Sequence, residues 1–100
     1  MVKKNITLEF KKSVSDLTGN RLGRSVFEKQ IQSNIIDEFT QVSVEIPENI
    51  NDVGTSFIQG IYSKLSEEYG SEKALKILSL YSKNTDTNVK IKKAIQVYGI

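Results

Sequence analysis

The segment from Gln41 to Gly70 changes its hydrophobic period once, and this change constrains the fold more than any other feature of the chain. Apolar and polar residues first alternate, which predicts a strand over 41–46 with one packed face and one wetter face. Pro47 ends this strand, because proline lacks the N–H that a sheet ladder needs. An amphipathic helix is predicted next, over 56–69. Its apolar face consists of Phe57, Ile58, Ile61, Tyr62, Leu65 and Tyr69.

The same two patterns, alternation typical of strands and spacing typical of helices, occur in the rest of the chain. Ile6, Leu8 and Phe10 alternate with polar residues and predict a strand, and helical spacing predicts a first helix over 20–33 that ends at Asn34. Its apolar positions are Leu22, Val26, Phe27 and Ile31.

The last third of the chain predicts one more strand and one more helix. Ala74–Tyr81 is a short apolar run, typical of a strand buried on both faces, although its Ala, Leu and Lys residues also suit a helix. A final helix is predicted over 87–98, capped by Thr87 and ended by Gly99.

Strands and helices therefore alternate in the order β-α-β-α-β-α. This order predicts a single small α/β domain over residues 1–100, with a mostly parallel or mixed sheet and helices packed on it.

The amino-acid composition excludes several classes of functional site. The chain has no cysteine and no histidine, so thiol nucleophiles, imidazole bases and the usual zinc sites are excluded, and we expect no enzyme activity, cofactor or metal. A net charge of +2 is too small to indicate a nucleic-acid partner. No signal peptide and no membrane-spanning run is apparent, so we expect a cytoplasmic protein with no membrane partner.

A hydroxyl pair, Thr55 and Ser56, stands where the second helix begins. Ser56 and Gln59 form a capping-box pattern, and Gly70 suits the left-handed residue that ends a helix. The start of a helix also favours negative charge, so the same corner suits a phosphorylated Ser56 or a bound anion. The residues alone leave these three uses open.

The stretch from Pro47 to Gly70, with SFIQGIYSKLSEEYG at its centre, resembles the STAS-like α/β domain of small bacterial and phage-encoded proteins. NRLGRSVFEKQI resembles the first helix of that family, and LKILSLYS followed by VKIKKAI resembles its last strand and helix. The resemblance runs from Thr18 to the end of the chain and implies a STAS-like fold.

The distant relatives in this family are the STAS domains of anti-sigma-factor antagonists. In them, a kinase of the histidine-kinase ATPase type phosphorylates a serine at the start of this helix, and the phosphate breaks contact with the partner. Ser56 matches that serine, and Thr55 precedes it. Gly54 stands where the relatives carry an acidic residue, and Phe57 stands where a glycine usually follows. Both differences favour a helix-cap role for Ser56 over phosphorylation.

We therefore expect a non-enzymatic, regulatory protein-interaction module that uses the 49–56 loop and the outer face of the 56–69 helix. The expected partner-binding residues are Asp52, Gly54, Thr55, Ser56 and Gln59. The resemblance implies a protein partner, either a histidine-kinase-type ATPase or a sigma-factor regulator, and a homodimer is a further option. The alternative is a phage or mobile-element-encoded inhibitor that occludes a host or defence enzyme. A less favoured alternative is a phosphate or weak nucleic-acid binder.

Overall fold

Three of the five strands form a parallel sheet in the order β1-β3-β5, and the other two form a small parallel ladder, β2-β4. The computed structural model describes residues 2–97. Its strands are β1 (Lys3–Thr7), β2 (Asp16–Leu17), β3 (Gln41–Ile46), β4 (Asp52–Val53) and β5 (Leu78–Ser82). Its α-helices are α1 (Asn20–Val26), α2 (Thr55–Tyr69), α3 (Ser71–Ile77) and α4 (Thr85–Val97). A π turn (Phe27–Ile31) and a 3-10 turn (Gln32–Asn34) continue α1.

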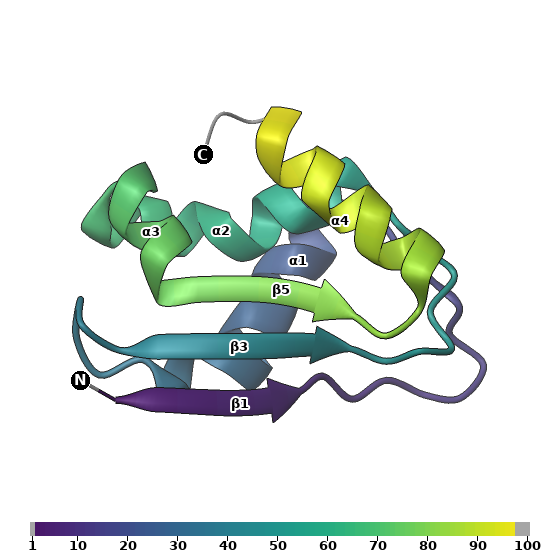
Figure 1. Cartoon of the computed structure of the whole chain (residues 1–100), viewed down its shortest axis with the longest axis horizontal. Helices are drawn as coiled ribbons and strands as arrows, with labels where there is room; N and C mark the ends of the chain where they lie inside the picture. Colours follow the sequence, from purple (N-terminus) through teal and green to yellow (C-terminus); the bar gives the residue numbers. More distant parts are fainter. Residues whose placement is uncertain (1, 98–100) are drawn as a thin grey trace.

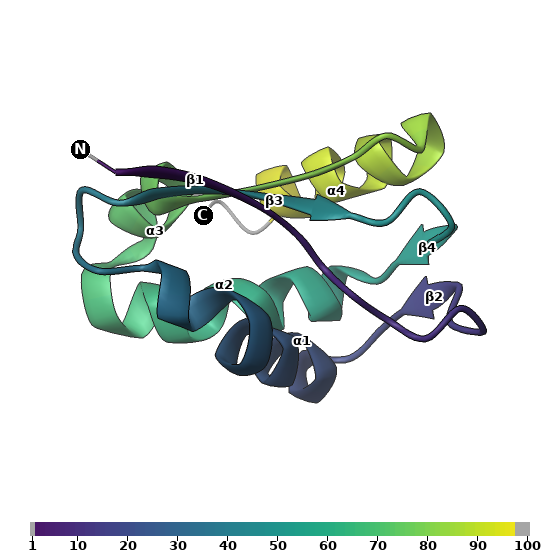
Figure 2. The ribbon, with the colours of Figure 1, turned by 90° about the horizontal axis from the view of Figure 1, so that it is seen from below.

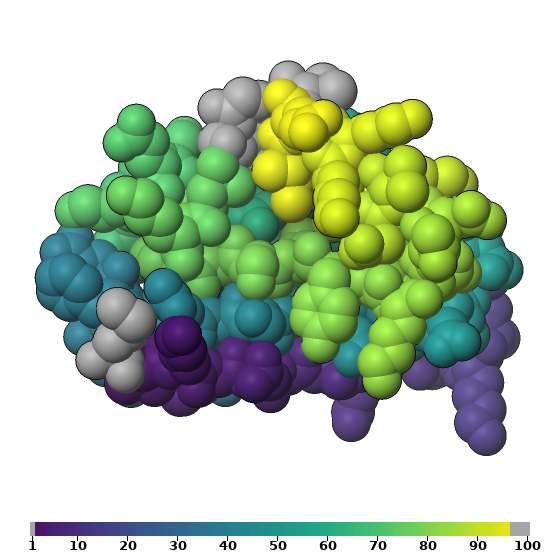
Figure 3. All heavy atoms as spheres, viewed as in Figure 1, coloured from purple at the N-terminus to yellow at the C-terminus, as the bar shows by residue number. Residues whose placement is uncertain are grey.

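Among the described residues, the helices leave one face of the sheet uncovered. α1 and α2 pack against the face turned away from the viewer in Figure 1, and α4 flanks the sheet beside β5 (Figures 1 and 2). On the opposite face the strands reach the surface (Figure 3). The burial of β3 follows this arrangement, since Val42, Val44 and Ile46 are buried whereas Gln41 is exposed. The sheet therefore has one apolar face and one polar face.

α1 and α2 approach one another through two glycines, Gly23 and Gly60. A Cβ atom added to Gly60 would lie 2.2 Å from the carbonyl oxygen of Asn20. A Cβ atom added to Gly23 would lie 2.2 Å from the carbonyl oxygen of Phe57. Both contacts are with backbone, which cannot rotate away as a side chain can. The absence of side chains at these positions therefore sets the distance between the two helices.

The predicted α/β class and the parallel arrangement are confirmed. β3 has the predicted bounds 41–46, and α2 begins one residue before the predicted 56–69. The helical segment predicted over 20–33 spans 20–34, but only its first half is α-helical. The Asn34 side chain donates to the carbonyl oxygens of Gln30 and Ile31, and this satisfies groups that the helix end leaves unpaired.

The first strand was predicted too late in the sequence. The ladder runs over Lys3–Thr7, whereas the apolar alternation suggested 6–10. Burial does alternate as far as Phe10, but at Glu9 the backbone N–H and carbonyl are bonded by the side-chain amide of Gln30 rather than by a strand. Hydrophobic period reports which face is buried, and hydrogen bonding with other segments decides where the ladder ends.

The prediction of a doubly buried strand over Ala74–Tyr81 is wrong. Its first half belongs to α3, and its second half belongs to β5, whose residues are alternately buried and exposed. Gly70, with φ of +87°, allows α3 to follow α2 directly. Leu22 also differs from expectation, because it is 39% exposed and Gly23 takes its place in the helix contact.

The predicted start of the last helix is also corrected. α4 begins at Thr85, and the Asn84 side chain caps it by accepting the N–H of Thr87 at 3.3 Å. Thr87 itself is buried inside the first turn. The predicted C-terminal residues of this helix, Tyr98 and Gly99, lie outside the described residues.

The buried phenol of Tyr62 joins α2 to the sheet, and removing it gives a testable prediction. Its hydroxyl donates to the carbonyl oxygen of Leu78 at 2.7 Å, and burial raises its pKa. Tyr62→Phe should lower the free energy of unfolding by about 1.5 kcal/mol, because the buried carbonyl loses its donor. Urea denaturation measures this change.

Tyr81→Phe is the matched control for that experiment. Tyr81 is exposed, and its hydroxyl lies 3.3 Å from a Glu45 carboxylate oxygen. Its loss should cost no more than about 0.5 kcal/mol. Equal losses for the two variants would show that the Tyr62 bond does not stabilise the packing of α2 on the sheet.

Candidate interaction site at the start of helix α2

The small β2-β4 ladder brings the starts of α1 and α2 together. β2 leads into α1 and β4 leads into α2, each after a short turn. The Gly54 N–H donates to the Leu17 carbonyl oxygen at 2.7 Å, which extends the pairing to the residue just before α2. Because the ladder is parallel, both helices begin on the same side of the molecule (Figure 2).

The start of α2 has no side-chain cap. Its N-cap residue is Gly54, and no side chain of residues 2–97 accepts a hydrogen bond from the first turn of the helix. The predicted capping box of Ser56 and Gln59 is therefore wrong. Ser56 is the second residue of the helix, and its hydroxyl accepts the Gly19 N–H at 3.1 Å. That bond ties α2 to the turn before α1, and it could form only between segments that meet through the fold.

Thr55 borders a shallow hollow between the start of α2 and α4. The hollow has a volume of about 350 Å³. It is lined by Asp52, Val53, Gly54, Thr55, Lys90, Lys93 and Ala94. Two lysine side chains thus stand beside the uncapped helix start, whose unpaired N–H groups carry partial positive charge. Asp52 is the acidic group in this lining.

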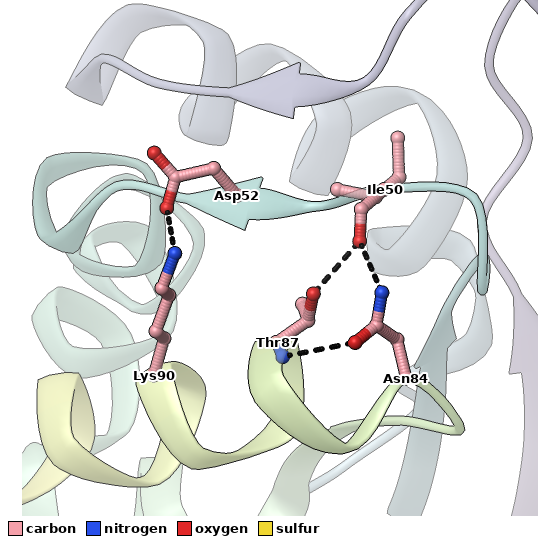
Figure 4. A network of polar contacts seen from close by, with 5 residues as sticks. All are labelled: Ile50, Asp52, Asn84, Thr87 and Lys90. Carbon is pink, nitrogen blue, oxygen red and sulfur yellow. Dashed lines mark hydrogen bonds and ion pairs between the residues drawn. The ribbon is translucent and has the colours of Figure 1, made fainter.

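Asp52 and Lys90 form an ion pair across the hollow, with 2.9 Å between Oδ1 and Nζ (Figure 4). The hydrogen bond and charge of Lys90 lower the pKa of Asp52, and Asp52 in turn raises the pKa of Lys90. Both side chains are about half exposed, so water and salt screen the pair. The pair orients Lys90 and leaves Lys93 as the second positive group of the lining.

A polar network holds the loop that precedes the site. The buried Thr87 hydroxyl donates to the Ile50 carbonyl oxygen at 2.8 Å, and the Asn84 side-chain NH₂ donates to the same oxygen at 3.5 Å (Figure 4). The Asn84 NH₂ also donates to the Glu48 carbonyl oxygen at 3.2 Å. The first turn of α4 therefore fixes the backbone of the 48–50 segment. Asp52 lies two residues after Ile50, so its position relative to Lys90 depends on the same turn.

The expected partner-binding residues do not form one continuous patch. Thr55 and Asp52 line the hollow beside α4, whereas the Ser56 hydroxyl is bonded to the turn before α1. Gln59 is exposed one turn further along α2. Beyond Gln59, α2 is joined to the π turn by the ion pair Lys64–Glu28 and to α1 by the ion pair Arg24–Glu67. The part of the predicted surface that lies at the hollow is the first turn of α2.

Sequence reasoning missed three contributors to this site: Gly19, the Asn84 cap and the pair of Lys90 and Lys93. The two lysines are three residues apart, a spacing that puts them on one helix face, but their nearness to Thr55 depends on how α4 packs. Within residues 2–97, no group of three or more His, Cys, Asp or Glu side chains could hold a metal ion.

No helix within residues 2–97 has both the length and the apolar character needed to cross a membrane.

Comparison with known proteins adds no family assignment. No family model, curated protein or solved structure matches this chain.

Proposed function

We propose that this chain is a non-enzymatic, regulatory protein-interaction module with a STAS-like fold that works in the cytoplasm. Its contact surface is the 49–56 loop and the first turn of α2. The observation that carries this proposal is the uncapped start of α2, where Thr55 and Ser56 are both exposed and Thr55 stands beside Lys90 and Lys93. Such a surface presents hydroxyls and positive charge on a backbone held by hydrogen bonds, as a docking site requires.

The charges favour a partner that presents an acidic group at this corner. Unpaired N–H groups at a helix start and the charge of Lys93 attract a carboxylate. Asp52 does not cancel this attraction, because Asp52 and Lys90 balance one another in their ion pair. The resemblance in the sequence supplies the expected class of partner, a histidine-kinase-type ATPase or a sigma-factor regulator.

Ser56 is the residue through which this contact would be regulated. A phosphate there adds about −1.5 to −2 charge and would repel an acidic group of the partner. The same phosphate would sit close to the Gly19 N–H that the hydroxyl now engages. Modification would therefore alter both the charge of the surface and the bond between the starts of α1 and α2.

The test compares two variants of the chain as baits in extracts of its natural host. Ser56→Asp should lower recovery of the partner about tenfold, because a carboxylate is placed where the partner's acidic group docks. Ser71→Asp is the matched control, since Ser71 is also exposed and also lies in the first turn of a helix that follows a glycine. Mass spectrometry identifies the partner and reports whether Ser56 is phosphorylated.

The identity of the partner separates the candidate functions. An ATPase or sigma-factor regulator whose recovery depends on Ser56 supports the proposal. A nuclease or restriction enzyme bound through the same corner would indicate an inhibitor that occludes a defence enzyme. Equal recovery with Ser56→Asp and Ser71→Asp would show that the start of α2 is not the contact surface.

A further inference from the structure

Within residues 2–97, the outer edge of β1 is the free edge of the sheet. There β1 pairs with β3 on one side only, whereas the opposite edge strand, β5, is flanked by α4 (Figure 1). The Gln41 N–H donates to the Val2 carbonyl, and the Leu8 N–H donates to the Glu45 carbonyl. Even-numbered residues of this segment therefore direct their backbone groups toward β3. Because the direction alternates along a strand, Lys3, Asn5 and Thr7 direct theirs outward.

One residue on this outer side, Glu9, has its backbone N–H and carbonyl hydrogen-bonded by a side chain. At Glu9, the next odd-numbered residue, the side-chain amide of Gln30 accepts the backbone N–H at 2.8 Å and donates to the backbone carbonyl at 3.0 Å. A side-chain amide thus occupies the place that a neighbouring strand would take. Gln30 closes the edge at Glu9, and the open stretch is Lys3–Thr7.

The positive charges of Lys3 and Lys4 indicate which kind of segment the Lys3–Thr7 edge would bind. Within residues 2–97, neither Lys3 nor Lys4 has an acidic side chain within ion-pair distance. Of the acidic residues in the loop that leads into β3, Glu38 pairs with Lys73. Asp37 accepts the N–H of Phe39 and keeps its charge, but it is not within ion-pair distance of Lys3 or Lys4. The positive charge of β1 is therefore available to an incoming segment.

We propose that the outer edge of β1 binds an extended acidic segment of a partner protein, which adds a strand to the sheet. The backbone of that segment pairs with Lys3, Asn5 and Thr7, and its acidic side chains lie beside Lys3 on the exposed face of the strand. Its alternate, apolar side chains pack on the other face beside Ile6, which is half-buried at this edge. This surface shares no residue with the start of α2, so the proposal stands apart from the function proposed above.

Lysine on an edge strand also has a protective role, because it discourages pairing with other chains. The test must therefore show pairing rather than charge attraction alone. The probe is a short, capped synthetic peptide in which glutamate alternates with valine, and the control peptide carries lysine in place of glutamate. Amide hydrogen exchange, followed by NMR, should slow at Lys3, Asn5 and Thr7 with the acidic peptide and remain unchanged with the basic one.

Two variants separate strand addition from other forms of binding. Asn5→Pro removes one outward N–H and leaves the bonds to β3 intact, and proline is tolerated where a strand edge faces solvent. It should weaken binding of the acidic peptide about tenfold, since at least one backbone bond is lost. Asn5→Ala keeps the N–H and should bind as the natural chain does. Thermal unfolding of both variants verifies that the sheet persists.

Three results would overturn the proposal. The first is unchanged exchange at Lys3, Asn5 and Thr7 at the highest soluble concentration of the acidic peptide. The second is equal binding by Asn5→Pro and Asn5→Ala. The third is a dimer of the natural chain, detected by sedimentation and abolished by Asn5→Pro, because the edge would then be occupied by a second copy.

Discussion

Replacing Gly60 with alanine should lower the free energy of unfolding by about 3 kcal/mol, the largest effect expected for a single methyl group in this chain. The added Cβ would stand 2.2 Å from the Asn20 carbonyl oxygen and 3.1 Å from the Arg24 nitrogen. These are backbone atoms, so α1 and α2 must move apart. Helix propensity acts in the opposite direction, by about 1 kcal/mol in favour of alanine. A net loss would therefore identify the helix contact as its cause.

Urea or thermal denaturation measures this loss, which corresponds to a fall of about 15 °C in the melting temperature. Gln59→Ala is the control, because Gln59 is the exposed neighbour in the same helix and its replacement should change stability by no more than about 0.5 kcal/mol. Gly23→Ala should behave as Gly60→Ala does. The variant that carries both substitutions should lose less free energy of unfolding than the two single variants lose together, because one separation of the helices relieves both clashes. A stabilised Gly60→Ala would refute the close approach.

Replacing Asn84 with alanine is expected to cost about 2 kcal/mol, the largest effect outside the contact between α1 and α2. The substitution removes the cap of α4, worth about 1 kcal/mol, and the bonds to the Glu48 and Ile50 carbonyls, worth about 1 kcal/mol more. It should also loosen the candidate site. Amide exchange in β4, measured by NMR, should become faster than in the natural chain.

Asn51→Ala is the control for this experiment, because Asn51 is an exposed asparagine in the same loop. It should leave both stability and exchange nearly unchanged. Thr87→Val tests the network from the other side, since Thr87 and Asn84 both donate to the Ile50 carbonyl. The two substitutions should be non-additive, because each alters the same acceptor. Additive losses would show that the two side chains act independently of this carbonyl.

Much of the fold follows from local sequence patterns. The alternation over Gln41–Ile46, the stop at Pro47 and the apolar face of α2 are short-range signals, and the structure agrees with each. The apolar run at Ala74–Tyr81 carries no such period, so helix and strand were both compatible with it. The glycines at 23 and 60 were the missed signal. A glycine inside a helix is unfavourable, which indicates a packing reason for its presence.

Only part of the candidate site could be predicted from the sequence. Thr55, Ser56 and Gly54 lie at the start of α2 as the sequence indicated, because a helix start is set by residues close in the chain. The acceptor role of Ser56 toward Gly19, the lysines beside Thr55 and the Asn84 network all join segments more than thirty residues apart.

The sequence alone determined which segments are helices or strands across most of the chain, which face of each is apolar, and that strands and helices alternate in an α/β order. These properties depend on periodicity and on turn residues, which act over a few positions. Only the tertiary structure decided which face of the sheet stays open, how closely α1 and α2 approach, and which charges surround the first turn of α2. Those properties depend on contacts between distant segments, and a single sequence does not reveal the partners in such contacts.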